Sequence, residues 1–210
     1  MQRAILATAY LAPVEYFYFL VNCEPFIEAH DLFQKQTYRS RCTIVTAAGV
    51  QTLSIPVVHH AGKMPIREVA IDYKTAWQRQ HWKSIITAYS KSPYFLYYRD
   101  YFEPFFTQRT ETLFEFNTTI TSLILKLLKA KTVLSFTPEY VKDYVEAVDL
   151  RNNLSPKRLA DFSTNFTLSE YERSFVHCAH FHRGISIMDL LFHKGMESLG
   201  YLQKYCHYVV

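Results

Sequence analysis

The chain has 210 residues, enough to bury a sizeable core in one large domain or two small ones. Hydrophobic residues make up 49% and charged residues 20% of the sequence, which is ordinary for a globular protein. The net charge of +4 is too small for an obligate nucleic-acid binder, and 5 glycines argue against a glycine-built phosphate loop. The four cysteines form no C-x-x-C pair, which argues against a zinc module or a disulfide scaffold.

The start of the chain has some features of a lipoprotein signal or a membrane anchor, because residues 4–21 are mostly apolar and Cys23 follows. Pro13 and Glu15 lie inside this run, and both are costly in a membrane-spanning segment. Asn22, rather than a small residue, precedes Cys23. We therefore expect a cytoplasmic protein without a membrane partner, whose apolar start is a buried strand and helix.

A strand–helix–strand unit is predicted at this start. Residues 4–10 are a short apolar run typical of a buried strand. Pro13 suits the first turn of a helix, where its missing N–H does no harm, and Glu15 then interacts favourably with the helix dipole. The helix over 14–21 is apolar almost all round, which indicates deep burial, and residues 26–29 predict the second strand.

A β-hairpin is predicted next, with a first strand beginning at Lys35, a turn at Gly49 and a second strand over 52–58. In an extended first strand, Lys35, Arg39 and Arg41 point to the same face. Three like charges on one face repel one another, so an anionic partner is one interpretation of this row. The other is a solvated edge strand that its charges protect from aggregation.

A long helix is predicted after a third strand, which contains Ile66, Val69 and Ile71 and ends at Asp72. Asp72 can cap this helix, which begins near Lys74. The helix carries an apolar stripe with the spacing i, i+3, i+4 and i+7, formed by Trp82, Ile85, Ile86 and Tyr89.

The second half of the chain is predicted to be largely helical. Residues 93–106 are dense in aromatic residues with a helical period, and residues 111–130 form a further helix. The β-branched run over 132–136 predicts a buried strand, and Gly195 is expected to end a C-terminal helix. The fold class is therefore α/β: a mixed sheet with a buried strand–helix–strand start, a hairpin and a helical second half, in a single domain over 1–210.

Trp77 and His81 are the best candidates for a chemical role, because a histidine one helical turn after a tryptophan can orient a substrate or move a proton. No acid at fixed spacing accompanies them, so a histidine that packs between helices is the alternative. Asp31, Asp72 and Asp100 are possible acids, and Asp72 is kept with His81 as a catalytic candidate.

No metal site is predicted. His59 and His60 are adjacent, so in a strand they face opposite sides. A second group would form two pairs on different faces of a helix, which disfavours one tetrahedral site: His177 and His180, Cys178 and His182. The sequence also contains no G-x-S-x-G, P-loop, G-x-G-x-x-G or kinase motif, which disfavours a serine hydrolase or nucleotide kinase of the usual kinds.

A series of motifs over roughly residues 5–130 resembles the WbqC-like family. The motifs occur in the family's order and are Tyr10-Leu-Ala-Pro13-x-x-Tyr16-Phe17, Lys35-Gln36-x-Tyr38-Arg39-x-Arg41-Cys42-x-Ile44, Leu53-x-Ile55-Pro56-Val57, Ile71-Asp72, Trp77-x-x-x-His81-Trp82-x-Ser84-Ile85 and Ala88-Tyr89-x-x-Ser92-Pro93-Tyr94-Phe95-x-x-Tyr98. The end of the chain resembles a Bacteroidetes branch of the family, through Ile185-Ser-Ile-Met-Asp189-Leu-Leu-Phe192-x-x-Gly195.

The resemblance implies a bacterial cytoplasmic protein that occurs with O-antigen and other surface-polysaccharide genes. It also implies a role in modifying a sugar, by transfer of glycine or another acyl group. The chain departs from the family pattern at Ala9-Tyr10, where many members have Gln-Pro, at Glu15, where many have Gly, and at Ser40, where many have Asn. The Ser-Gly-x-x-Gly loop common near the C-terminus of members is missing.

A ligand site is expected where the first strand ends and the first helix begins. Helix N-termini attract anions, and ligands of open α/β sheets bind at the carboxyl ends of the strands. The family motifs would converge there, and the expected ligand-binding residues are Tyr10, Pro13, Tyr16, Lys35, Tyr38, Arg39, Arg41 and Trp77.

The leading hypothesis is an enzyme, with transferase as its candidate class, that acts on an anionic small molecule such as a nucleotide-sugar or acyl donor. Lys35, Arg39 and Arg41 would hold its phosphate or carboxylate, and His81 would be the acid or base. The alternative is a non-catalytic partner-binding or structural protein, and nucleic-acid binding is a distant third. The sequence predicts no particular cofactor and leaves the oligomeric state open.

Overall fold

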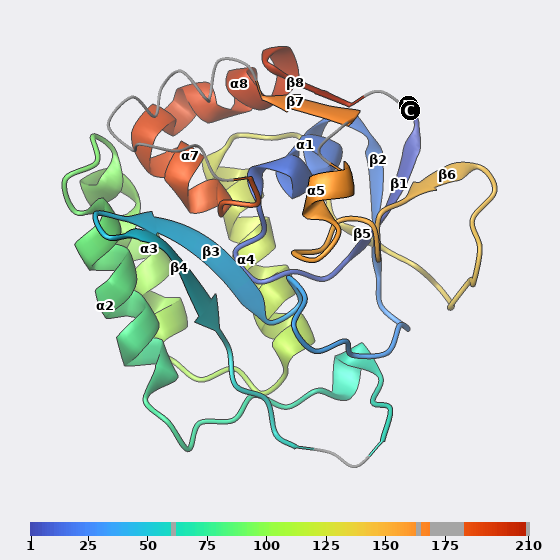
Figure 1. Ribbon diagram of the computed structural model, residues 1–210, viewed down its shortest axis with the longest axis horizontal. Helices are drawn as coiled ribbons and strands as arrows, with labels where there is room; N and C mark the ends of the chain where they lie inside the picture. The colour runs from blue at the N-terminus through green and yellow to red at the C-terminus, as the bar shows by residue number, and fades with distance from the viewer. Residues whose placement is uncertain (60–61, 163–164, 169–182, 209–210) are drawn as a thin grey trace.

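The computed structural model describes residues 1–59, 62–162, 165–168 and 183–208. It has a mixed α/β architecture, as predicted, in which a parallel sheet lies beside a separate β-hairpin and a group of helices (Figure 1). In the described part of the chain, no helix is both long and apolar enough to cross a bilayer.

The predicted strand–helix–strand unit is confirmed. β1 (Arg3–Ala7) leads through α1 (Val14–Asn22) to β2 (Glu24–Glu28), and the two strands pair in parallel. β5 (Ser135–Phe136) and β6 (Ala147–Asp149) complete a four-stranded parallel sheet in the order β5-β2-β1-β6. The chain thus builds outward from β1 to β5 and then returns to the other side of β1. The strand order reverses between β1 and β6, which we call the switch point.

The hairpin is confirmed, but its first strand begins later than predicted. β3 (Arg41–Thr46) pairs antiparallel with β4 (Gly49–Ser54). Residues 35–40 form turns instead of an extended strand, and Gln36 has a positive φ of 62°. The expected row of cations on one strand face is therefore wrong, because the turns bury Arg39 and leave Lys35 exposed.

The predicted third strand around Ile66 is a short 3₁₀ helix, η1 (Ile66–Glu68), followed by isolated bridges of Ala70 and Ile71. Asp72 does not cap α2 (Trp77–Tyr89), because that helix begins five residues later. The Asp72 carboxylate instead accepts the backbone N–H of Lys74 at 2.8 Å and closes a turn. The apolar stripe of α2 is buried as predicted, apart from the half-buried Ile86.

α3 (Phe95–Thr107) and α4 (Leu113–Leu127) confirm the two helices predicted after α2. Thr112 caps α4, since its hydroxyl accepts the backbone N–H of Glu115 at 3.2 Å. The strand predicted over 132–136 shrinks to β5, whose two residues are exposed at the edge of the sheet. Its expected burial is wrong because β5 is the outermost strand of this sheet among the described residues and pairs with β2 along one edge.

The C-terminal part is helical with one small sheet. The elements are α5 (Leu159–Phe162), β7 (Phe166–Leu168), α7 (Ile187–Lys194), η3 (Gly195–Glu197), α8 (Ser198–Lys204) and β8 (Cys206–Tyr208), with β7 and β8 antiparallel. Gly195 ends α7 as predicted, with a φ of 56°.

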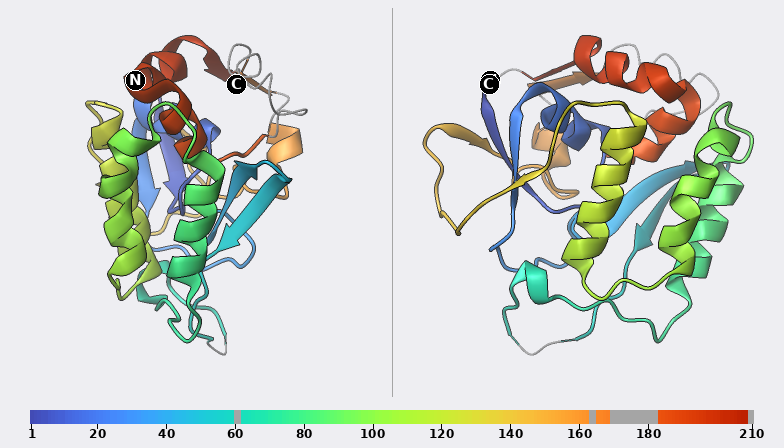
Figure 2. Two further views of the ribbon diagram at one scale, coloured as in Figure 1. Left: turned by 90° about the vertical axis from the view of Figure 1, so that its left-hand side faces the viewer. Right: turned by 180° about the vertical axis from the view of Figure 1, so that it is seen from behind.

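α4 lies between the parallel sheet on one side and the hairpin with α2 and α3 on the other (Figures 1 and 2). The segment before α7 connects these parts. Ile185 accepts the backbone N–H of Val14 at 3.1 Å, and Ser186 donates its N–H to Thr43 on the hairpin at 2.8 Å. Gly184 donates its N–H to the buried carboxylate of Glu15 at 3.1 Å. One short segment therefore holds the start of α1 against β3.

Gly184 is the position in this segment that least tolerates a side chain. Its φ is +74°, and an added Cβ would lie 2.3 Å from the Tyr38 hydroxyl and 2.5 Å from Leu159. We predict that Gly184→Ala lowers the free energy of unfolding by roughly 2–5 kcal/mol, through backbone strain and overpacking. Urea denaturation of the purified proteins measures this loss.

Gly200 in α8 supplies the matched control, because nothing lies within 4 Å of a Cβ added there. Gly200→Ala should leave stability unchanged or raise it by about 0.5–1 kcal/mol, since alanine favours a helix over glycine. Equal effects of the two substitutions would contradict the packing of Tyr38 on Gly184.

Candidate functional site

A small cavity lies at the switch point, at the carboxyl ends of β1 and β6. Its volume is about 10 Å³, which is room for a single water. Three segments build it: the turn after β1, the turns before β3, and the loop after β6. The lining residues are Ala7, Thr8, Ala9, Tyr16, Thr37, Tyr38, Arg39, Leu150 and Leu154.

Arg39 is the charged group of this cavity, and its side chain is only 2% exposed. Its guanidinium Nη2 donates to the Asp31 carboxylate, and its carbonyl accepts the Asn117 amide at 2.8 Å. Burial lowers the pKa of Arg39, and the charge and hydrogen bond of Asp31 oppose that shift. A buried arginine is tolerated only with such a partner. Sequence spacing did not pair Asp31 with any group.

A second buried arginine, Arg151, lies just beyond the end of β6. Its Nη1 contacts the Glu28 carboxylate at 3.2 Å, and its Nε donates to Asp149 at 3.0 Å. Glu28 also accepts the Thr137 hydroxyl at 2.9 Å. The hydrogen bond to Asp149 raises the pKa of Arg151, so it remains charged. The ends of β2, β5 and β6 thus share one ionic network.

Sequence reasoning missed this second network. Glu28 and Asp149 are the last residues of their strands, and a carboxylate ending a buried strand was a signal available in the sequence. Asp149 and Arg151 lie in a polar stretch of sequence, and the three-residue β6 is too short to show a strand pattern there.

Two loops meet above the cavity and form its rim. Gln34 donates its amide to Asn152 at 3.0 Å, which joins the turns before β3 to the loop after β6. Lys35 lies exposed on the first loop, which makes this side of the rim attractive to anions. Lys157 and Arg158 lie exposed five and six residues after Asn152, in the segment that leads from the second loop to α5.

Tyr10, Trp77 and His81 come together, but in a cluster separate from the cavity. The Tyr10 hydroxyl lies 2.9 Å from His81 Nδ1, and the His81 ring also hydrogen-bonds to the backbone of Ser54. The Trp77 and His81 rings are 5.1 Å apart. A backbone hydrogen bond links this cluster to the cavity, because the Tyr10 N–H donates to the Tyr38 carbonyl at 2.8 Å. Burial lowers the pKa of His81 to about 4, so His81 is neutral near pH 7.

The remaining predicted site residues divide between the cavity and other places. Tyr16 reaches the cavity and donates its hydroxyl to the Ala7 carbonyl at 2.9 Å. Pro13 caps α1 beneath residues 184–187. The expected open helix N-terminus is therefore wrong, because backbone of this segment and the Glu15 side chain occupy it. Arg41 opens β3 opposite Ser54, and Asp72 lies in the turn before α2.

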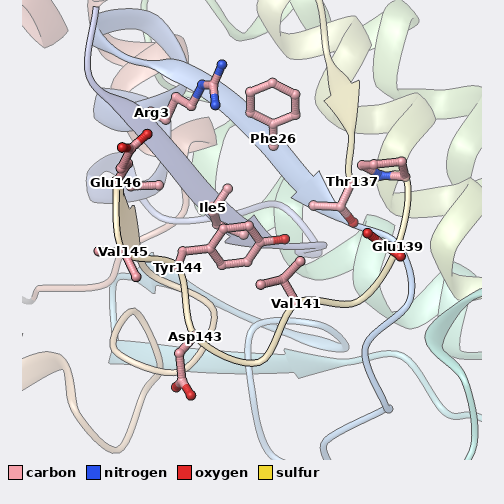
Figure 3. A pocket seen from close by; sticks show the side chains of 12 residues that line it. Arg3, Ile5, Phe26, Thr137, Glu139, Val141, Asp143, Tyr144, Val145 and Glu146 are labelled. Atoms are coloured by element: carbon pink, nitrogen blue, oxygen red, sulfur yellow. The ribbon is translucent and has the colours of Figure 1, made fainter.

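A larger and mostly apolar pocket of about 390 Å³ lies on the face of the parallel sheet, under the loop that joins β5 to β6. Ile5 and Phe26 form its floor, and Val141 and Tyr144 lie on the loop that covers it (Figure 3). Arg151 holds this loop in place, because its guanidinium donates to the carbonyls of Val141 and Lys142, each at 2.8 Å. None of the predicted site residues lines this pocket.

No group of three metal-ligating side chains occurs in the described ranges. His60 and the group His177, Cys178, His180 and His182 lie outside the described residues.

The lowered pKa of His81 makes stability depend on pH. A histidine with a pKa of about 4 in the folded protein and 6.5 in the unfolded chain binds more protons when unfolded, so its contribution is complete above pH 6.5 and is lost as the pH falls towards 4. Between pH 7 and pH 4.5, we predict that the free energy of unfolding falls by about 2–3 kcal/mol less in His81→Gln than in the wild type, because glutamine keeps a neutral hydrogen-bonding group. Urea unfolding at both pH values measures it, and identical losses in the two proteins would contradict burial of a neutral His81.

Comparison with known proteins identifies a family that this chain matches. The model of the WbqC-like protein family matches residues 8–201. The chain is also 26% identical over 227 residues to the uncharacterized protein Rv1507c of Mycobacterium tuberculosis, covering 97% of each chain. No solved structure matches.

Proposed function

The chain belongs to the WbqC-like protein family, and we propose that it is an enzyme that binds an anionic sugar or acyl donor at the switch point. The resemblance described above supports a transfer reaction in surface-polysaccharide (O-antigen) biosynthesis, with glycine, another aminoacyl group or an acyl group placed on a sugar. The donor would be a nucleotide-sugar or a similar activated molecule.

The observation that carries this proposal is the position of the cations. Open α/β sheets bind ligands outside the carboxyl ends of their strands, where the strand order reverses. Here buried Arg39 lines the cavity, Lys35 lies exposed on one of the two loops that close it, and Lys157 and Arg158 lie exposed further along the other loop. An arginine held by a carboxylate keeps a fixed orientation, which suits the recognition of phosphate or carboxylate.

A donor cannot fit into about 10 Å³, so binding requires the two loops of the rim to separate. A side-chain hydrogen bond between Gln34 and Asn152 joins these two loops. An exposed hydrogen bond between neutral groups contributes about 1 kcal/mol or less, so its loss adds little to the free energy of opening. Closure over the ligand would then exclude water from the site.

His81 and Asp72 remain the proposed acid and base. His81 is neutral near pH 7, and its Nδ1 lies 2.9 Å from the Tyr10 hydroxyl. The link from Tyr10 to the cavity is a backbone hydrogen bond to Tyr38, which cannot relay a proton. His81 would therefore act on a substrate only if the core opened to bring the two into contact.

The alternative function, partner binding without catalysis, has its own observation. α3 exposes three large apolar side chains to solvent: Leu96 at 74%, Tyr97 at 74% and Tyr101 at 53%. Exposed aromatic and aliphatic side chains along one helix are typical of a protein contact.

We predict that an anionic donor raises the melting temperature and that rim cations set its affinity. The panel is UDP-sugars, acyl-coenzyme A, inorganic phosphate and free amino acids, because ligands that bind only the folded state stabilise it by mass action. Lys35→Ala and Arg158→Ala should each weaken binding about threefold to tenfold at low salt, with less effect at high salt.

Lys131→Ala is the matched control, since Lys131 is also exposed but lies near the amino ends of the strands. It should leave affinity unchanged. A cooperatively melting protein that no anion stabilises, or an affinity that falls equally in all three variants, would contradict the proposal and favour partner binding.

A further inference from the structure

Contacts connect Ser92 and His193, which are accessible to solvent, with the buried Asp189. The Ser92 hydroxyl is 3.4 Å from His193 Nε2. On the other side of the ring, His193 Nδ1 is 2.8 Å from the backbone carbonyl and 3.0 Å from the carboxylate Oδ1 of Asp189. Asp189 is fully buried, and its second oxygen accepts the Tyr89 hydroxyl at 3.2 Å.

The hydrophobic core fixes this arrangement. Ser92 lies in the turn between α2 and α3, and the other two residues are one turn apart on α7. The backbone of Tyr94 donates to Phe192 at 3.0 Å, which ties that turn to α7. The ring of Phe192 packs against Tyr89 and Phe95, so both sides of the contact rest on buried aromatic groups.

The hydrogen bonds select one tautomer of His193. Its Nδ1–H points to Asp189, whose backbone carbonyl and carboxylate Oδ1 lie 2.8 Å and 3.0 Å away. Nε2 then carries the lone pair and faces the Ser92 hydroxyl, as a general base must. Burial alone lowers the pKa of His193, but the hydrogen bond and charge of Asp189 outweigh it and raise the pKa overall.

We propose that Ser92 is an activated nucleophile that takes an acyl group from an activated ester or thioester, with His193 as general base and Asp189 as positioning residue. Ser92 Oγ bonds to the acyl carbon while its proton passes to His193 Nε2. The bond from the acyl carbon to the leaving oxygen or sulfur breaks, and His193 returns the proton to the leaving group. Water, deprotonated by His193, then releases the acid and restores Ser92.

The expected reactivity is moderate. In the turn around Ser92, the N–H groups of Ser92, Tyr94 and Phe95 already donate to the carbonyls of Tyr89, Phe192 and Ser92, so none of these three is left for an oxyanion. General-base assistance alone gives about 10²–10⁴-fold acceleration. The chain lacks the G-x-S-x-G motif, but this constellation recurs on unrelated folds and is recognised by its geometry.

The site shares no residue with the switch-point cavity, so the two proposals fail independently. The experiment is labelling with a fluorophosphonate, which phosphonylates a nucleophilic serine with loss of fluoride. Peptide mass spectrometry identifies the labelled serine, and a time course measures the rate at which the adduct forms. We expect an adduct on Ser92, and we expect His193→Gln to slow its formation at least tenfold while the melting temperature stays close to that of the wild type.

Ser90 serves as the internal control, because it is an exposed serine at the end of the same helix. In the Ser90→Ala variant, Ser92 should be labelled at the wild-type rate. In the Ser92→Ala variant, no serine of this turn should be labelled. An adduct formed equally on Ser90 and Ser92, no adduct on Ser92, or an unchanged rate in His193→Gln would each overturn the proposal.

Asp189→Asn tests the positioning role separately, because asparagine keeps the size of the side chain and removes its charge. The titratable groups that act on His193 are Asp189 and Lys194 on α7 and, by ring contact, Tyr89 on α2. Loss of the Asp189 charge should move the pH midpoint of labelling to lower pH. A folded variant with the wild-type midpoint would show that Asp189 has only a structural role.

Discussion

Two buried arginines hold the loops of this protein to the carboxyl ends of its parallel strands. Arg39 pairs with Asp31, and Arg151 pairs with Glu28 and Asp149. Breaking a buried ion pair by removing one partner costs about 3–5 kcal/mol, because the other charge is left without compensation. Each pair therefore admits very few loop conformations. The positions of the turns before β3 and of the loop before β6 depend on these pairs.

This constraint explains how the sheet manages with little helical cover on one face. Parallel sheets normally bury both faces under crossover helices. The connection from β5 to β6 contains no helix among the described residues, and it crosses the sheet as a loop. Arg151 replaces the missing helix packing with hydrogen bonds to two loop carbonyls and contacts with the rings of Tyr140 and Tyr144. A pocket remains beneath the loop because a loop fills space less completely than a helix (Figure 3).

The sequence was sufficient where a local pattern and the tertiary fold agree. The strand–helix–strand start, α2, α4 and the end of α7 at Gly195 follow from periodicity, Pro13 and glycine chemistry. It was insufficient where a distant partner decides the conformation. Alternation predicts an extended strand at Arg39, but the ion pair with Asp31 favours turns that bury it. Likewise, the contact of Ser92 with His193 joins residues 101 positions apart, which no spacing rule can anticipate.

The predicted site residues separate into two physical classes, and the separation bears on mechanism. Tyr10, Trp77 and His81 are almost fully buried: Tyr10 and His81 hydrogen-bond to each other, and the Trp77 ring packs against His81. Arg39 is equally buried, but it borders the crevice where two loops meet, one of which carries the exposed Lys35. A ligand that separates those loops reaches Arg39 without disturbing the aromatic cluster. Binding at the switch point is therefore compatible with a rigid core, whereas direct contact of a ligand with His81 would require the core itself to open.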